Sequence, residues 1–218
     1  MTESQRHALD DFWQDYGIEY TQDQIDLIEL FGRPAPTVMD IGTGMGDSCI
    51  ALASNHPENN YLAVEVHRPG VGSLLRQIHT RQLGNVRVSN HDVIEILTYQ
   101  TPPNSLDEVH IFFPDPWPKK RHFKRRLINP VFLRLLSPCL KSHARLFIAT
   151  DWEDYAESIL AAIAETPGYV NLAGDQQTAP RPHWRPLTKF EKRGKSLGHA
   201  VYDFVFSYKD KDNTSVKS

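Results

Sequence analysis

The sequence predicts an α/β protein in which a mostly parallel β-sheet lies between two layers of helices. Short apolar runs, rich in β-branched and aromatic residues, alternate along the chain with segments of helical periodicity. A glycine-rich turn follows the first apolar run, and acidic residues end the first three. This alternation is typical of βαβ units, whose parallel sheet is covered by helices on both faces.

The predicted elements follow this alternation in order. The first strand runs into its glycine turn over 37–46, and further strands are predicted at 60–67, 86–92, 106–115, 144–151 and 199–209. Helices are predicted at 47–55, 69–83, 93–100, 125–140 and 152–165. Pro130 lies inside the fourth helix, so we expect that helix either to kink or to begin late.

Composition indicates an ordinary globular chain. Of the 218 residues, 40% are hydrophobic and 23% are charged, and the formal net charge is -3. The apolar runs are shorter than the roughly 18 residues of a membrane span, and the N-terminus lacks the pattern of a secretory signal. We therefore expect a cytoplasmic protein with an acidic extension over 1–31, a main domain over 32–208 and a polar tail over 209–218.

Charge is distributed unevenly along the chain. Residues 1–31 contain eight acidic residues and one basic residue. Residues 119–126 contain six Lys or Arg and no acid, and residues 181–195 contain six Lys or Arg and one glutamate. A solvated surface is the ordinary interpretation of a charged segment. Two basic segments beside aromatic residues and prolines favour a polyanionic partner.

Gly42, Gly44 and Gly46 form the turn that ends the first strand. Glycine permits positive φ angles and lets the backbone approach a ligand closely. A dinucleotide-binding turn would have its third glycine at position 47, where this chain has Asp47. A carboxylate at the start of a helix repels a diphosphate. The turn is therefore predicted to bind a ligand without phosphate.

Acidic residues end the first three predicted strands. Asp40 precedes the turn. Glu65 ends the second strand, 25 positions after Asp40, and Asp92 ends the third strand. Ligands of open α/β sheets bind at the carboxyl ends of the strands, where acids can accept hydrogen bonds from ribose hydroxyls and an adenine amino group. Any one of these acids can instead be a helix cap or a turn residue. Together with the turn, the three acids predict S-adenosylmethionine.

A proline-rich loop follows the fourth strand. In FPDPWPKKRH, three prolines stiffen the chain around Asp115 and Trp117. Enzymes that methylate amino groups often have a related Asp/Asn-Pro-Pro-Tyr/Phe loop that holds a planar nitrogen nucleophile. The alternatives are a hydrophobic lid for Trp117 and a turn for Asp115, but loops on rigid scaffolds often carry function. The basic segment 119–126 follows immediately.

These motifs together resemble the bacterial tRNA (guanine-N7-)-methyltransferase family. The matching segments are, in order, DIGTGMG, AVEVHRPGVG, HDVIEIL, FFPDPWPKKRHFKRRL, ATDWEDYAE and RPLTKFEKRGKSLGHAVYDFVF. They extend from about residue 38 to residue 206, and FPDPWPKKRH and TKFEKRG are the most specific. Asp40 stands where many members have glutamate, which shortens the side chain and keeps its charge.

The resemblance implies a Rossmann-like, S-adenosylmethionine-dependent methyltransferase domain that converts a guanine in the variable loop of tRNA to 7-methylguanosine. It implies cofactor contacts for Asp40, Gly42, Gly44, Glu65, Asp92 and Asp115. Asp115, between cofactor and base, is also the implied catalytic residue. Substrate contacts are implied for Lys119, Asp151, Thr188, Lys189, Phe190 and Glu191, and RNA-backbone contacts for Arg121, Lys124, Arg125 and Arg126.

Other functions stay open at this point. An S-adenosylmethionine-dependent enzyme acting on another RNA position or on a small molecule is one alternative, and a non-catalytic tRNA-binding protein of the same fold is another. Asp47 disfavours a dinucleotide-dependent oxidoreductase. The ten histidines and two cysteines lack metal-ligand spacing. We therefore expect tRNA as partner, no metal, no membrane, and a monomer or homodimer.

Overall fold

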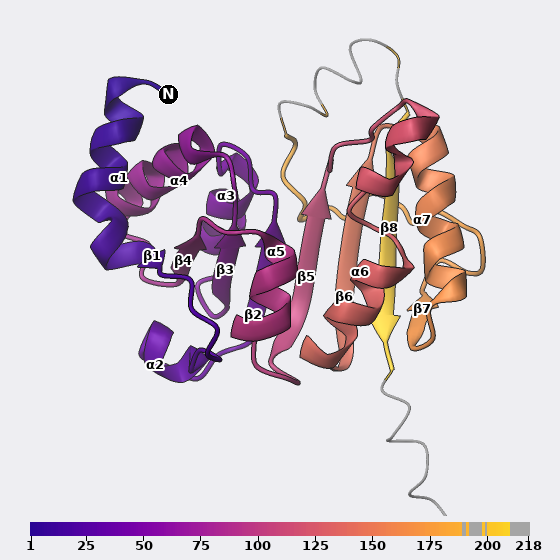
Figure 1. The fold of residues 1–218 in the computed structure, drawn as a ribbon, viewed down its shortest axis with the longest axis horizontal. Coiled ribbons are helices and arrows are strands. Elements are labelled where there is room, and N and C mark those ends of the chain that lie inside the picture. Colours follow the sequence, from indigo (N-terminus) through magenta and orange to yellow (C-terminus); the bar gives the residue numbers. More distant parts are fainter. Residues whose placement is uncertain (189–190, 192–197, 199, 210–218) are drawn as a thin grey trace, which may run out of the picture. The chain divides into compact units, whose positions relative to one another are not determined.

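The computed structural model describes residues 1–188, 191, 198 and 200–209. The chain forms two compact units. Unit 1 comprises Met1–Pro102 and His183–Thr188, and unit 2 comprises Pro103–Pro182 and the described residues from 191 onward. In each unit β-strands are flanked by helices (Figure 1), which confirms the predicted alternation. Within the described part of the chain, no helix is long and apolar enough to cross a membrane.

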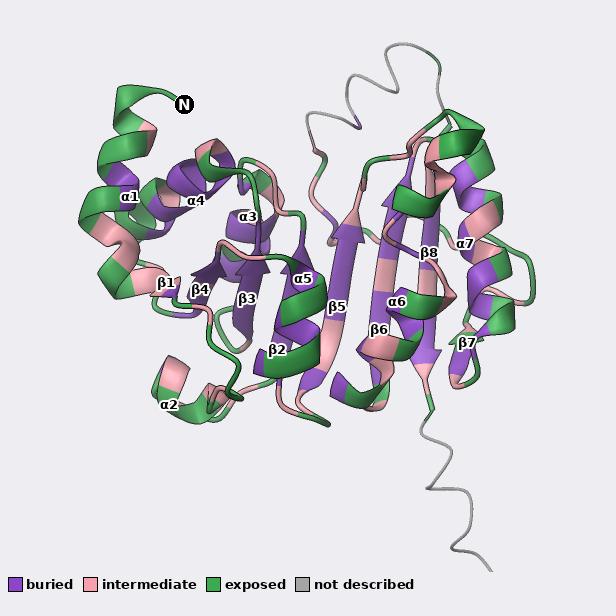
Figure 2. Cartoon of the chain, in the orientation of Figure 1, coloured by how far each residue is buried: buried purple, intermediate pink, exposed green. Residues whose placement is uncertain are grey.

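Unit 1 holds parallel strands in the order β1-β4-β3-β2. Their bounds are Gly17–Ile18 (β1), Thr37–Ile41 (β2), Asn60–Val64 (β3) and Val86–Ser89 (β4). Asp40 pairs with Ala63, and Val64 pairs with Ser89, so the carboxyl ends of β2, β3 and β4 lie together. β2 and β3 are buried at every position (Figure 2). This is expected of near-continuous apolar strands in a parallel sheet.

The helices of unit 1 are α1 (Glu3–Tyr16), α2 (Leu27–Phe31), α3 (Asp47–Asn55), α4 (Arg68–Arg81) and α5 (Val93–Glu95). The helices predicted at 47–55 and 69–83 are confirmed as α3 and α4. The helix predicted at 93–100 is also present, but it changes its hydrogen-bonding pattern: α5 continues as a π-helix over Ile96–Gln100.

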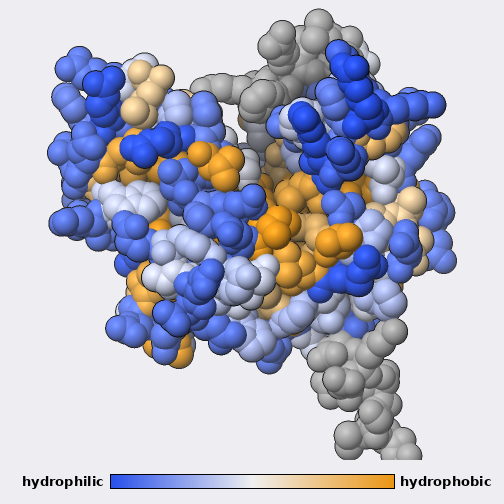
Figure 3. Space-filling view, viewed as in Figure 1, coloured by the Kyte–Doolittle hydropathy of each residue, from blue (hydrophilic) through white to orange (hydrophobic). Residues whose placement is uncertain are grey.

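The acidic extension over residues 1–31, called the leader from here on, folds into α1, β1 and α2. These elements are missing from the prediction. A capping box begins α1, because Thr2 Oγ1 accepts from the Gln5 N–H while the Gln5 side chain accepts from the Thr2 N–H. That spacing is a readable signal for a helix start. The side chains of α1 are mostly hydrophilic on the face seen in Figure 3. Since β1 pairs with β4, the leader is part of unit 1, and the boundary at residue 31 stays a prediction.

Unit 2 holds strands in the order β5-β6-β8-β7. Their bounds are Leu106–Phe112 (β5), Leu140–Thr150 (β6), Tyr169–Asn171 (β7) and Tyr202–Tyr208 (β8). β5 and β6 are parallel, whereas β8 is antiparallel to both β6 and β7. The predicted strands are present, and the three-residue β7 is an addition too short for the sequence pattern to reveal.

The helical segments of unit 2 are a 3₁₀-helix at Lys120–Arg125, α6 (Pro130–Leu136), a 3₁₀ turn at Ser137–Cys139, and α7 (Glu153–Glu165). The helix predicted at 125–140 begins late, at Pro130. Asn129 caps it, because its Oδ1 accepts from the N–H groups of Val131 and Phe132. Proline is favoured in the first turn because its missing N–H would have no partner there.

Candidate active site

The glycine turn connects β2 to α3 and has positive φ angles, which residues other than glycine rarely adopt. Gly42, Gly44 and Gly46 have φ angles of 75°, 58° and 88°. A Cβ added at Gly42 or Gly44 would meet no atom within 4 Å, so conformation rather than space requires glycine there. A Cβ at Gly46 would lie 2.6 Å from Leu74 Cδ1. The turn therefore presents open backbone at Gly42 and Gly44 and is closely packed at Gly46.

Glu65 directly contacts this turn. Its carboxylate is buried, and Oε2 accepts a hydrogen bond from the Gly44 N–H at 2.6 Å. Oε1 accepts from the His67 N–H at 2.7 Å, and Asn90 Nδ2 donates to the Glu65 carbonyl at 2.7 Å. Glu65, predicted at the end of the second strand, is thus hydrogen-bonded to the predicted glycine turn within unit 1.

Asp40 and Asp92 lie in different environments. Asp40 is 3% exposed and lies beside Cys49. Burial, and then the Asp40 carboxylate, raise the pKa of the Cys49 thiol well above its usual value. Asp92 is exposed and caps α5, since its Oδ1 accepts from the Ile94 N–H at 2.8 Å. The helix-cap role considered for these acids is therefore observed at Asp92, whose second carboxylate oxygen is not used in the cap.

Two hydroxyl groups, one in the turn and one just after it, are not among the predicted site residues. The Oγ1 of Thr43 and the Oγ of Ser48 are buried and have no hydrogen-bond partner among the described residues. Buried polar atoms of this kind usually have a partner. Together with the acids and the open glycine backbone, they provide hydrogen-bonding groups of the kind that a ligand with hydroxyl, amino and cationic groups requires. The residues of unit 1 therefore fit S-adenosylmethionine.

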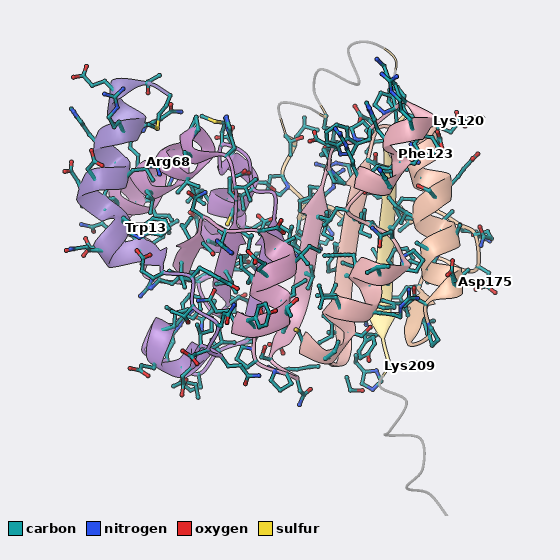
Figure 4. The ribbon with its side chains drawn as sticks, viewed as in Figure 1. Trp13, Arg68, Lys120, Phe123, Asp175 and Lys209 are labelled. Atoms are coloured by element: carbon teal, nitrogen blue, oxygen red, sulfur yellow. The ribbon has the colours of Figure 1, made fainter. Side chains whose placement is uncertain are left out.

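Unit 1 also contains a cavity of about 560 Å³. Trp13 of α1 and Arg68 at the start of α4 line it, and both are labelled in Figure 4. Asn90 and His91, which directly precede Asp92 in the sequence, also line this cavity. The ring of His91 stacks on that of Tyr20 with centroids 3.6 Å apart, so the loop after β4 is held against the leader.

In unit 2, the proline-rich loop after β5 has an unusual backbone. Phe113 and Trp117 have positive φ angles of 55° and 45°, a conformation that is rare for bulky residues and concentrates at functional loops. Asp115 is exposed between them. The Arg125 guanidinium lies 4.9 Å from the centre of the Trp117 ring, and His122 packs edge-on against the same ring. Trp117 thus joins the loop to the basic segment.

Most of the basic segment is solvent-exposed. Lys119, Arg121, Lys124 and Arg125 are exposed. Lys120 and Phe123, labelled in Figure 4, mark the 3₁₀-helix that carries all of these side chains except that of Lys119, which precedes it. Strongly hydrophilic side chains cover the same region in Figure 3. Four of the predicted substrate- and RNA-contacting cations are therefore accessible.

Arg126 requires a correction. It was predicted to contact the RNA backbone, but it is only 4% exposed. Its Nε donates to the Pro116 carbonyl at 2.8 Å, and its Nη1 pairs with Asp154 at 3.3 Å. The guanidinium lies 3.7 Å from the centre of the Phe123 ring and 4.9 Å from that of Tyr155. Its donors and planar faces are used inside unit 2, so Arg126 anchors the basic segment instead of presenting a charge.

The remaining predicted residues are placed separately. Asp151 follows β6 and is half-buried, and Thr188, also half-buried, belongs to unit 1. Glu191 is completely buried, and its Oε1 accepts from Arg181 Nε at 2.9 Å. Lys189 and Phe190 lie outside the described residues. Across the described ranges, no group of three or more His, Cys, Asp or Glu side chains is arranged to hold a metal ion.

Known proteins are similar to this chain in sequence and in fold. A family model described as a putative methyltransferase matches residues 34–204. The chain is 48% identical over 206 residues to the tRNA (guanine-N(7)-)-methyltransferase of Hydrogenovibrio crunogenus, covering 94% of this chain and 86% of that protein. It is 49% identical over 209 residues to the protein of the same name from Nitrosospira multiformis, covering 96% and 90%.

Solved structures match at lower identity. The 16S rRNA methyltransferase KamB has a TM-score of 0.65 and 17% identity, covering 89% of this chain and 99% of that chain. A SAM-dependent O-methyltransferase from Thermotoga maritima has a TM-score of 0.55 and 15% identity, covering 86% and 68%. At these identities the likeness shows the fold alone. It confirms the predicted α/β, Rossmann-like methyltransferase fold with a mostly parallel sheet.

Proposed function

The chain belongs to the tRNA (guanine-N7-)-methyltransferase family, and we propose that it transfers a methyl group from S-adenosylmethionine to N7 of a guanine in the variable loop of tRNA. The observation that carries this proposal is the 48–49% identity to proteins of that name over nearly the whole chain. The match spans both the glycine turn and the proline-rich loop, so it includes the motifs for cofactor and for substrate.

We propose that unit 1 holds the cofactor. Glu65 accepts hydrogen bonds from the ribose hydroxyls, Asp92 from the adenine amino group, and Asp40 lies near the cationic part of the molecule. The open backbone of Gly42 and Gly44 permits close approach, and the buried hydroxyls of Thr43 and Ser48 support this assignment. When bound, S-adenosylmethionine supplies the methyl group that is transferred.

Methyl transfer to guanine N7 requires no proton transfer to or from the protein before the nucleophile can react. Guanine N7 carries a lone pair and no proton, so no general base is needed to create the nucleophile. Positioning can then supply much of the acceleration. As the methyl group arrives, the purine becomes positively charged, and a carboxylate beside it stabilises that charge. We assign this role to Asp115, which is exposed, with Asp151 as a second substrate carboxylate.

Carboxylates also provide base specificity. Guanine presents a ring N–H and an exocyclic amino group, which donate together to a carboxylate, whereas adenine has no N–H at the corresponding ring position. Lys119 and Thr188 complete the proposed substrate contacts, together with Lys189 and Phe190, which lie outside the described residues. Glu191 belongs to the same motif, although its carboxylate is bound to Arg181 inside unit 2.

The exposed cations of the basic segment are assigned to the tRNA backbone. Arg121, Lys124 and Arg125 are the members of this set, and Arg126 is excluded because it is buried. Contacts of Lys and Arg with phosphates release counterions, so they provide affinity that is independent of sequence and sensitive to salt. The proline-rich loop adjoins this segment, which links base recognition to backbone binding.

The proposal is tested by incubating the purified protein with methyl-labelled S-adenosylmethionine and unmodified tRNA, followed by nucleoside analysis. We expect the label in 7-methylguanosine. Label in another nucleoside would retain the enzyme class and contradict the proposed position. Cofactor binding without any transfer, across a panel of unmodified tRNAs, would contradict the proposed substrate, and absence of cofactor binding would favour a non-catalytic tRNA-binding protein.

A further inference from the structure

A backbone carbonyl in the glycine turn is held by two side chains of α4. Ser73 Oγ donates to the Met45 carbonyl at 3.0 Å, and Gln77 Nε2 donates to the same oxygen at 2.9 Å. Ser73 is 5% exposed. The Met45 side chain itself is exposed, so the contact depends on the Met45 backbone and not on the identity of its side chain.

The same face of α4 packs against the glycines. A Cβ at Gly70 would overlap the Gly44 carbonyl oxygen, and Leu74 is the residue that a Cβ at Gly46 would meet. Positions 70, 73, 74 and 77 follow the i, i+3, i+4, i+7 spacing of one helical face. One face of α4 therefore contacts the turn from Gly70 to Gln77.

The opposite face of α4 packs against α1. A Cβ at Gly72 would overlap the Gln5 carbonyl oxygen, and the ring of His79 stacks on that of Phe12 with centroids 3.8 Å apart. With about 100° of rotation per residue, positions 72 and 79 lie roughly opposite positions 70 and 77. α4 is thus held between the leader and the glycine turn, and it is fixed on both faces.

The turn needs such support because of its composition. Three glycines in five residues sample many backbone conformations, including those with positive φ, and lose more conformational entropy than other residues when they are ordered. If a ligand binds only one conformation of the turn, its apparent affinity falls by the fraction of molecules that have that conformation. Contacts that hold the turn in place therefore increase ligand affinity without touching the ligand.

We propose that Ser73 and Gln77 are positioning residues for S-adenosylmethionine, and that they act by holding the Met45 carbonyl so that the glycine turn keeps its binding conformation. This inference rests on the proposed function, because the turn is taken to be the cofactor-binding element. Neither residue belongs to the predicted cofactor set. Glu65 also holds this turn, through the Gly44 N–H.

The test compares Ser73→Ala, Gln77→Leu and the double variant with the wild type in the full chain. S-adenosylmethionine affinity is measured by calorimetry, and methyl transfer is measured at varied cofactor concentration with saturating tRNA. Each substitution removes one hydrogen bond, so we expect about fivefold weaker cofactor binding for each variant and a larger loss for the double variant. KM for the cofactor should rise while kcat at saturating cofactor and tRNA affinity are retained.

Thr80→Ala is the matched control. Thr80 lies on α4, is exposed, and donates from Oγ1 to the Arg76 carbonyl within the helix, so its loss should leave cofactor affinity unchanged. Should Ser73→Ala fold poorly, Gln77→Leu decides the question, because Gln77 is only partly buried. Unchanged cofactor affinity in a folded Gln77→Leu variant, or a fall in kcat without a rise in KM, would overturn the inference. A wild type that binds no cofactor would instead overturn the proposed function.

Discussion

The carboxylate of Glu65 accepts a hydrogen bond from the backbone N–H of Gly44 at 2.6 Å. An acid at the end of β3 therefore fixes the conformation of the turn at the end of β2. Because a carboxylate oxygen can accept more than one hydrogen bond, this contact leaves Glu65 able to accept from a ligand as well. A substitution at Glu65 should therefore affect both the conformation of the turn and the proposed contact with the ligand.

Glu65→Gln should weaken S-adenosylmethionine binding by about 1–3 kcal/mol. Hydrogen bonds to a charged acceptor are stronger, and the single amide oxygen would replace the two carboxylate oxygens that accept from the Gly44 and His67 N–H groups. Calorimetric titration of the cofactor measures the change. Glu58→Gln, at an exposed position, is the control. Equal affinity of wild type and Glu65→Gln would exclude Glu65 from the cofactor site.

Asp115→Ala should reduce kcat by roughly 10- to 100-fold, since it removes a carboxylate expected to stabilise charge on the methylated base. tRNA affinity should stay near the wild-type value because phosphate contacts dominate it. Single-turnover kinetics and filter binding separate the two effects. Asp175→Ala, another exposed acid of unit 2 (Figure 4), is the control, and a parallel loss of affinity and rate in Asp115→Ala would contradict the assignment.

Arg125→Ala and Arg126→Ala should have different consequences although the residues are adjacent. Removal of the exposed Arg125 should weaken tRNA binding and reduce the salt slope by about 0.7–0.9. Removal of Arg126 should lower the free energy of unfolding by about 2 kcal/mol, because it deletes buried packing and hydrogen bonds while the half-exposed Asp154 can regain water. Salt-dependent binding and urea unfolding measure these effects, and an unchanged salt slope in Arg125→Ala would remove that residue from the RNA surface.

Gly46→Ala should destabilise the protein by at least about 1–2 kcal/mol, the usual cost of left-handed backbone for an L-residue, with a further cost from the contact with Leu74. Gly84→Ala is the matched control, because a Cβ there would meet no atom within 4 Å. Thermal unfolding of both variants provides the comparison. Equal melting temperatures would show that α4 and the turn can readjust around the added methyl group.

Alkaline pH should destabilise unit 2 through Tyr155. Burial raises the pKa of Tyr155 to about 12 from 10.0, so the unfolded chain loses this proton at lower pH than the folded one. The stabilisation is complete below pH 10 and is lost as the pH rises toward about 12, by roughly 2–3 kcal/mol in total. Urea unfolding between pH 8 and 12 measures the slope. Tyr155→Phe should reduce this slope, whereas Tyr99→Phe, at an exposed position, should leave it unchanged.

Several elements could be predicted because their signals are local. The bounds of α3 agree with the prediction. Asp40 lies near the end of β2, and Glu65 and Asp92 follow β3 and β4, whose apolar runs are visible in the sequence. The leader was underestimated, although Thr2 and Gln5 carry the spacing of a capping box. β1 and β7 have only two and three residues, and strands of that length depend on their partners and not on their own pattern.

The fold class, the glycine turn and the acids at the strand ends could be predicted from the sequence alone, because periodicity, glycine and strand termini are properties of neighbouring residues. The environment of each cation depends on the folded chain. Arg125 and Arg126 are identical in type and adjacent, yet one is exposed and the other is enclosed by Pro116, Phe123 and Asp154. The folded chain also brings Ser73 and Gln77 to the Met45 carbonyl, 28 and 32 positions away in the sequence. Burial and long-range hydrogen bonds depend on which segments the folded chain brings together, and no local pattern records that.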